Sequence, residues 1–171
     1  MPDFRAAERT FSLITQVAGR AGRFFPDGEV IVQSYDPERI PIACACTGQT
    51  DVFYAEELRQ RKMLGFPPFS RLIRLVFRAA TESAAESSAE QAAAILRQSM
   101  DTFGKTQQTT AELLGPSECA IEKIAMNYRW QILLRSRNIG LLQKMCAHLI
   151  YDFNRPQDVY IEADVDPVNL L

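Results

Sequence analysis

The sequence contains few of the residues that build disulfide or metal centres. Four cysteines in 171 residues are too few for a disulfide-stabilised scaffold, and the sequence contains a single histidine. No apolar run approaches the ~18–20 residues that a membrane-spanning helix requires. The N-terminal residues contain no apolar stretch of the signal-peptide type. These absences predict a cytoplasmic protein that does not span a membrane.

The cysteines and the histidine also lack the spacing of a functional centre. Cys44 and Cys46 have no matching second pair, and Cys119 and Cys146 fall in a predicted strand and a predicted helix. Zinc requires four nitrogen or sulfur ligands, so we expect no metal site. His148 has no serine or cysteine partner in a recognisable motif, and a structural role is expected for it.

A third absence concerns nucleotide binding. The pattern G-x-x-x-x-G-K-[ST] occurs nowhere in the chain, so no phosphate-binding loop can hold a nucleotide here. Apolar residues make up 47% of the sequence and charged residues 23%, which is typical of a globular protein. The net charge of −2 excludes a uniformly basic protein. Charge is nevertheless uneven, because residues 56–78 hold six basic and two acidic side chains, and residues 151–171 hold one and five.

The first third of the chain predicts two helices and a strand. Apolar spacing favours a helix over residues 6–18 that ends at Gly19 and Gly22. The β-branched residues 29–35 predict a strand, and residues 51–64 predict a helix that Asp51 caps. The segment Phe-Pro-Pro-Phe at 66–69 cannot continue a helix. We therefore place a domain boundary there, which gives domains 1–66 and 67–171.

The second domain shows alternating and helical patterns in a recognisable order. Thr81 is expected to cap the first helix of this domain and Asn138 the second. Gly115-Pro116 is expected to mark a bulge or an edge in a broken strand. The order β-α-β-β-α-β predicts an α+β fold with an antiparallel sheet, two helices on one face and the other face open. The predicted elements are strands at 71–78, 111–125, 128–135 and 159–165, helices at 81–103 and from 138, and a link at 104–110.

Residues 1–66 are too short to form a stable α/β domain, whose parallel sheet needs several strands. They are typical of the last piece of a larger domain. Within them, the octet from Gln16 to Arg23 reads Q-x-x-G-R-x-G-R. Arginine donates two parallel hydrogen bonds to a phosphate, and glycine allows a close backbone approach. The alternative is that Arg20 and Arg23 only complement the helix dipole.

The octet resembles the sixth conserved motif of superfamily-two helicases. Its surroundings, "PDFRAAERTFSLITQVAGRAGR", "GEVIVQSYDPE", "FYAEELRQRKMLGFPPFSRL", "LGP", "YRWQILLR" and "DVDP", resemble successive blocks of one family. That family is bacterial primosomal protein N-prime, the PriA helicases that restart stalled replication. The resemblance runs from Pro2 to Leu171 and identifies the chain as a C-terminal fragment.

The resemblance implies a parent that is an ATP-dependent 3′–5′ DNA helicase and hydrolase, which recognises stalled or branched forks and assembles the primosome. Residues 1–66 would be the tail of its second RecA-like lobe. Gln16, Arg20 and Arg23 would take the catalytic positions, with Arg23 the arginine finger, and Gly19 and Gly22 would lie at the nucleotide. ATP and magnesium belong to the parent, as does zinc in an upstream region absent here. The fragment alone is expected neither to hold a cofactor nor to hydrolyse ATP.

Forked or single-stranded DNA is the expected partner of the second domain. Arg74 and Arg78 on one strand share the open face with Arg129 and Arg135 on the strand expected beside it. Glu162 and Asp164 should lie next to Arg74 and Arg78 and weaken their field. Tyr128 and Trp130 should pack in the core. Arg129, Arg135 and Arg137 are therefore the better DNA-binding candidates, together with basic residues 59, 61 and 62 near the boundary.

Two alternatives remain open at this point. The second domain could instead dock single-strand-binding protein or primosome proteins, in which case the exposed joint at 66–69 would matter more than the arginines. It could also be a structural brace for the helicase lobe that binds nothing strongly. Separate titrations with forked DNA and with an acidic partner peptide would distinguish these hypotheses.

Overall fold

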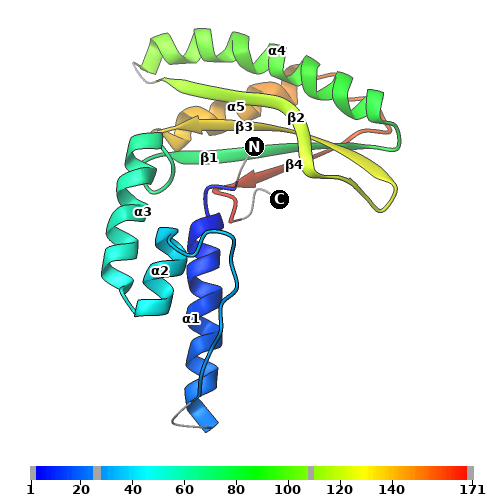
Figure 1. Ribbon diagram of the computed structural model, residues 1–171. Coiled ribbons are helices and arrows are strands. Elements are labelled where there is room, and N and C mark those ends of the chain that lie inside the picture. The colour runs from blue at the N-terminus through cyan, green and yellow to red at the C-terminus, as the bar shows by residue number, and fades with distance from the viewer. Residues whose placement is uncertain (1–2, 25–27, 108–109, 169–171) are drawn as a thin grey trace. The chain divides into compact units, whose positions relative to one another are not determined.

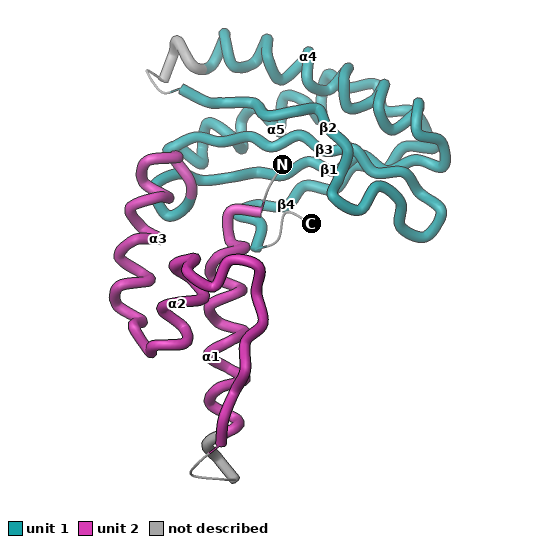
Figure 2. The backbone as a smooth tube through the Cα atoms, in the orientation of Figure 1, with its two compact units in different colours: residues 1, 67–171 teal, residues 2–66 magenta. Residues whose placement is uncertain are grey.

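A computed structural model describes residues 3–24, 28–107 and 110–168, without the side chains of residues 22–24 and 104–107. The chain divides into two compact units, Pro2–Phe66 and Pro67–Leu171, which Figure 2 distinguishes by colour. Each unit has its own buried cluster of apolar side chains. None of the described helices combines the length and the hydropathy that a membrane span requires.

The first unit consists of three helices. They are α1 (Ala6–Phe24), α2 (Ile40–Thr47) and α3 (Thr50–Leu64), drawn in blue to cyan in Figure 1. The Phe11 ring of α1 stacks on the Phe53 ring of α3, with centroids 4.2 Å apart, and buried Cys44 of α2 joins this cluster. Arg61 of α3 reinforces the contact, since its guanidinium lies 2.8 Å from both Glu8 and Glu57.

Three expectations for this unit are wrong. Helix α1 does not end at Gly19 or Gly22 but continues to Phe24. Residues 29–35 form no strand, because no other strand lies in the described part of this unit to pair with them. Asp51 does not cap α3, which begins one residue earlier after Gln49. At the other end of α3, Gly65 adopts the left-handed conformation (φ 66°) and ends the helix as expected.

The second unit has the predicted β-α-β-β-α-β order. Strand β1 (Arg71–Ala79) pairs with β3 (Asn127–Ser136) and β4 (Tyr160–Val165), and β2 (Ala111–Ile124) pairs with β3. The sheet is antiparallel with the order β2-β3-β1-β4. Helices α4 (Glu82–Gln107) and α5 (Ile139–Asp152) lie on the same side of it in Figure 1. Helix α4 extends through most of the segment predicted as a link.

The core lies between the sheet and these two helices. The side chains of Ile73, Leu75 and Phe77 alternate to this side of β1, as their spacing predicts, and all are at most 2% exposed. Trp130 packs at the edge of this cluster, and Tyr128 packs beside the smaller cluster around Val159, so both point away from the opposite face. Asn138 caps α5, since its side chain accepts a hydrogen bond from the Leu141 backbone N–H at 3.3 Å.

The opposite face of the sheet is not open at its centre. Leu72, Val76 and Leu133 on that face are at most 5% exposed. Strand β2 bends beyond its irregularity at Gly115-Pro116, and this brings buried Cys119 to Arg74. The tail after β4 is fastened to β1 by Asp166, which accepts hydrogen bonds from Arg71 and from the Leu72 backbone. Solvent therefore reaches mainly the periphery of this face.

Gly115 is a position where only glycine fits. Its φ is +98°, and a Cβ built there would lie 2.9 Å from the backbone oxygen of Gln131. We expect Gly115→Ala to lower the free energy of unfolding of this unit by more than about 1 kcal/mol. Chemical denaturation followed by the fluorescence of Trp130, the one tryptophan in the sequence, measures this change.

Gly19 provides a matched control of opposite sign. It lies inside α1, and nothing lies within 4 Å of a Cβ built on it. Gly19→Ala should therefore raise the stability of α1 by about 0.5–1 kcal/mol, visible as increased helical circular dichroism at a given temperature. Equal effects of the two alanine substitutions would contradict the conformations described for both glycines.

Candidate nucleotide and nucleic-acid contact residues

The octet of glycines and arginines lies on the second half of α1. Gln16, Arg20 and Arg23 are spaced at i, i+4 and i+7, so their Cα positions follow one face of the helix. Gln16, Gly19 and Arg20 are exposed. The Arg23 side chain and the exposure of Gly22 lie outside what the structure describes. Because the helix is continuous, Gln16, Arg20 and Arg23 lie in a row along it and not around a turn at its C-terminus.

Arg20 is available for a ligand. It forms no ion pair with any of the residues that the structure describes, in contrast to Arg9 in the same helix, which lies 2.8 Å from Asp3. An exposed guanidinium can donate two hydrogen bonds to a phosphate without first losing an internal partner. If Arg20 only complemented the helix dipole, its i, i+4 alignment with Gln16 would not be required.

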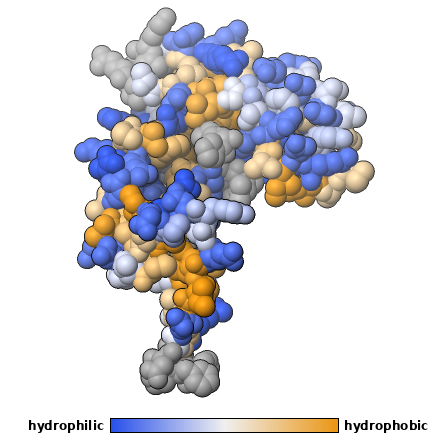
Figure 3. Space-filling model, in the orientation of Figure 1, coloured by the Kyte–Doolittle hydropathy of each residue, from blue (hydrophilic) through white to orange (hydrophobic). Residues whose placement is uncertain are grey.

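The apolar side of this half of α1 is only partly covered. Phe11 is buried against α3, but Leu13 is 62% and Val17 46% exposed. Ile31 and Tyr35 in the segment predicted as a strand are also highly exposed, and Figure 3 shows apolar surface over α1. The β-branched pattern of residues 29–35 is typical of a buried strand, yet no described residue pairs with it.

The five arginines proposed for DNA have different surroundings. Arg74 is only 5% exposed, and its Nε donates to Gln131 Oε1 at 2.9 Å. Its Nη2 also lies 3.7 Å from the Cys119 sulfur. The expectation that Arg74 presents its charge on an open face is therefore wrong, because β2 bends over this position. The guanidinium instead forms part of the buried polar layer of the sheet.

Arg78 and Arg135 lie at the periphery of this face and are paired with carboxylates. Arg78 lies 2.6 Å from Glu162, as the expected β1–β4 pairing implies, and next to the Tyr160 ring. Arg135 forms an ion pair with Glu112 across the β2–β3 pair. Both arginines would have to share or exchange these partners to contact a phosphate.

Arg129 and Arg137 have fewer competing contacts. Arg129 Nη1 donates to the backbone oxygen of Ile121 at 3.3 Å, and Arg137 is exposed directly after β3. Neither forms an ion pair with a side chain in the described ranges. Sequence reasoning missed Lys123, whose ammonium lies 4.4 Å from the centroid of the Tyr128 ring. The sequence signal for this contact was the short turn at Ala125 and Met126, which places Lys123 opposite Tyr128 on the neighbouring strand.

Among described residues, no group of three or more histidine, cysteine or acidic side chains could hold a metal ion.

The joint at 66–69 is partly covered. The Phe66 ring stacks on Phe4 with centroids 5.2 Å apart, and Phe69 is 37% exposed. The docking alternative requires an exposed joint, and only part of this segment is exposed. Of the basic residues near the boundary, Arg59 is paired with Glu56, Arg61 with Glu8 and Glu57, and Lys62 is exposed.

Comparison with known families identifies the second unit. The family described as "Primosomal protein N C-terminal domain" matches residues 62–168, which include the whole four-stranded sheet and both of its helices. This chain belongs to that family. The resemblance inferred from the motifs is confirmed at this level.

Relatives of this PriA family extend the match to nearly the whole chain. The protein named "Replication restart protein PriA" from Treponema pallidum (strain Nichols) is 46% identical over 170 residues, or 99% of this chain and 25% of that protein. Its namesake from Borreliella burgdorferi is 37% identical over 174 residues, or 100% of this chain and 25% of that protein. The chain thus spans about a quarter of these relatives.

The similarity to one solved structure is weak. A hydantoinase/carbamoylase family amidase from Burkholderia ambifaria aligns with a TM-score of 0.35 and 17% identity, over 56% of this chain and 27% of that one. A similarity at this level supports no inference about fold or activity.

Proposed function

We propose that this PriA-family chain is the C-terminal part of a replication-restart helicase, supplying phosphate-contacting arginines from α1 and a DNA-binding surface from its second unit. The observation that carries the proposal is the combined match: residues 62–168 fit the family, and relatives named replication restart protein align over the motif of α1 as well. ATP-driven unwinding, a 3′–5′ direction and fork recognition would be activities of the longer protein.

The residues of α1 are suited to contact a nucleotide from one side only. Gln16 and Arg20 are exposed on one face, and Arg23 follows on the same face by position. The sequence contains no phosphate-binding loop to hold ATP and magnesium. These residues therefore do not form a complete nucleotide site. Their proposed contribution is positive charge and hydrogen bonding toward phosphates that another part of the protein would hold.

The proposed DNA surface centres on Arg137 and Arg129, at opposite ends of β3, because neither forms an ion pair with a carboxylate in the described residues. Glu118 and Glu122 nevertheless line the same small pocket as Arg129. Lys123 of the β2–β3 hairpin is not part of this surface, because it pairs with Tyr128 across the strands and its ammonium lies over the Tyr128 ring, on the helix-covered side of the sheet. Positive side chains along a strand can follow a phosphate backbone, and affinity then depends on the salt concentration. Single-strand-binding protein and primosome proteins are further proposed partners, for which this geometry defines no site.

Replacing Arg129 and Arg137 together with alanine should weaken binding to a forked DNA with single-stranded arms. Each lost phosphate contact should reduce the slope of log affinity against log salt by about 0.7–0.9. Fluorescence anisotropy at several salt concentrations, with the 171-residue chain and a labelled fork, measures both quantities. The paired residues Arg78 and Arg135 should contribute less when replaced singly.

Lys144→Ala is the matched control, since Lys144 is exposed on α5, on the helical side of the sheet. It removes one positive charge from the same unit and should leave the salt slope unchanged. An equal loss in the control would assign the effect to net charge rather than to this surface. Unchanged affinity and slope in the double variant would refute the proposed surface.

A further inference from the structure

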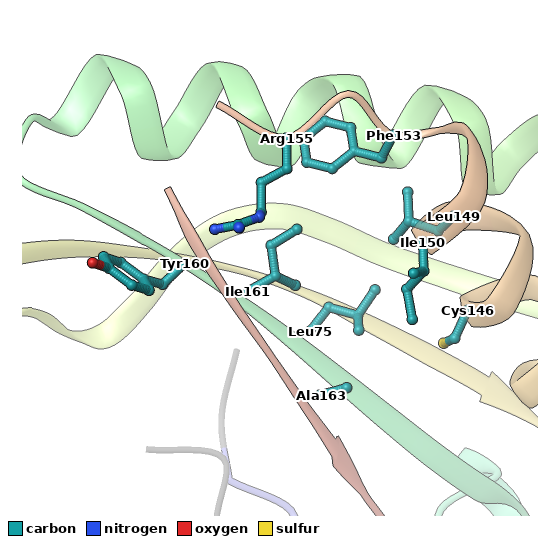
Figure 4. A pocket seen from close by; sticks show the side chains of 9 residues that line it. All are labelled: Leu75, Cys146, Leu149, Ile150, Phe153, Arg155, Tyr160, Ile161 and Ala163. Carbon is teal, nitrogen blue, oxygen red and sulfur yellow. The ribbon is translucent and has the colours of Figure 1, made fainter. Parts of the chain in front are cut away.

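An apolar cavity opens at the edge of the sheet, and none of the arginines considered above for DNA or nucleotide lines it. Its volume is about 430 Å³, and it lies between α5 and strands β1 and β4 (Figure 4). Leu75, Ile161 and Ala163 form its sheet side. Its opposite side consists of Cys146, Leu149, Ile150 and Phe153. A volume of this size accommodates a large aromatic or aliphatic side chain.

The mouth of the cavity is also apolar. Ile150 lines the cavity yet is 79% exposed, and the neighbouring Tyr151 is 93% exposed. Burial inside the cavity wall raises the pKa of the Cys146 thiol to about 11, as expected for a site with few polar groups. Exposed large apolar side chains around a preformed cavity are a feature of binding sites.

The edge of the sheet at this cavity is unpaired. Strand β4 is the last strand of the order β2-β3-β1-β4 and pairs only with β1 in the described part of the chain. Its outer edge therefore offers backbone N–H and C=O groups to an incoming strand. Ile161 and Ala163 alternate to the cavity side, whereas Glu162 points to the other face and pairs with Arg78.

Arg155 supplies one fixed positive charge at this cavity. Its Nη1 donates a hydrogen bond to the backbone oxygen of Val159, which is fully buried just before β4. In Figure 4 the side chain extends from the loop after α5 toward the space between Phe153 and Tyr160. None of the ion pairs among the described residues involves Arg155. Of the nearby carboxylates, Asp152 lies 3.1 Å from His148 and Glu162 contacts Arg78.

We propose that this edge binds an extended acidic-apolar segment of a partner protein. The segment would add a strand to the outer edge of β4 and place one large apolar side chain in the cavity. A side-chain carboxylate two residues away, on the same face of the added strand, would pair with Arg155. The fixed guanidinium beside an apolar cavity selects this chemistry over a neutral or basic segment. This surface is distinct from the proposed DNA surface and does not depend on it.

Three labelled peptides with amidated C-termini test the proposal against the 171-residue chain. The probe is Thr-Val-Asp-Thr-Phe-Thr-Asp-Val-Thr, which offers the carboxylate in either strand direction. In one control peptide Lys replaces both Asp residues, and in the other Ala replaces Phe. Fluorescence anisotropy should show at least about tenfold weaker binding of each control peptide, because one loses the charge pair and the other the buried ring.

Variants of the protein locate the binding site. Arg155→Gln should abolish most of the preference for Asp over Lys, and Ala163→Phe should prevent binding by filling the cavity. Lys144→Gln should change nothing, because Lys144 lies on α5 but does not line the cavity. Because Ala163→Phe could disturb folding, alkylation of Cys146 in the unmodified protein gives an independent measurement. Bound probe should slow this reaction, as followed by peptide mass spectrometry.

Equal affinity for the three peptides would overturn the proposal. So would selective binding that leaves Cys146 alkylation unchanged, because the segment would then bind elsewhere. Retained preference for Asp in Arg155→Gln would refute the assigned charge pair.

Discussion

Arg23→Ala, introduced into a full-length PriA-family protein that contains this segment, is expected to lower DNA-stimulated ATP turnover by about 10³–10⁵-fold. An arginine that stabilises the charge on a transferring phosphoryl group contributes this much to the rate. The fold places Arg20 and Arg23 along one face of α1, and the motif assigns the larger role to Arg23. Arg20→Ala should reduce turnover less. Steady-state ATPase rates with saturating DNA and ATP measure both effects.

Arg39→Ala controls for the loss of an arginine from the same unit. Arg39 is exposed and contacts only the neighbouring Asp36, at 3.7 Å, among the ion pairs of the described residues. It should leave turnover unchanged. An Arg23→Ala protein that folds, binds DNA and retains turnover within tenfold would contradict the proposed role. The complementary check is the 171-residue chain itself, which should show no turnover because it lacks a phosphate-binding loop.

The second large effect concerns stability. Phe77→Ala should lower the free energy of unfolding of the sheet-containing unit by about 3–5 kcal/mol. The ring is fully buried, and it meets the Phe153 ring edge to face at a centroid distance of 6.4 Å. Truncation removes this contact and leaves a cavity in the centre of the core. Urea denaturation followed by Trp130 fluorescence reports on this unit, because the chain has no other tryptophan.

Phe53→Ala is the matched truncation in the other unit. Phe53 is 1% exposed and stacks on Phe11, and its cluster shares no member with the cluster around Phe77. The Trp130 transition should stay in place, whereas helical circular dichroism should be lost at lower denaturant. A Trp130 transition that shifts equally in both variants would show that the two cores unfold together. An unshifted transition in Phe77→Ala would contradict the described core.

Local patterns predicted the second unit well because its signals are short-range. Apolar alternation in residues 71–78 and 128–135 depends only on the two-residue period of a strand, and both strands formed. Asn138 caps α5 through a contact three residues away. The β-α-β-β-α-β order then limits the possible topologies, and the pairing of β1 with both β3 and β4 followed.

The errors arose where the outcome depends on distant or absent partners. Residues 29–35 have a strand pattern, but a strand needs a neighbour for its backbone hydrogen bonds, and none is present in the described residues. Glycines 19 and 22 are compatible with either a helix end or a helix interior, and α1 continued through both. Helix α2 was missed, since its eight residues show no amphipathic period.

The sequence by itself determined the family, the order of the second unit's elements and the row of Gln16, Arg20 and Arg23. These properties reside in residue identity and local period, which need no knowledge of packing. Only the tertiary structure decided which arginines are accessible. Arg74 and Arg78 have the same alternation, yet the bend in β2 buries Arg74, and Glu162 on a strand more than 80 residues away pairs with Arg78. The cavity beside Arg155 likewise forms only where α5 meets the free edge of β4, because burial and ion pairing depend on neighbours in space.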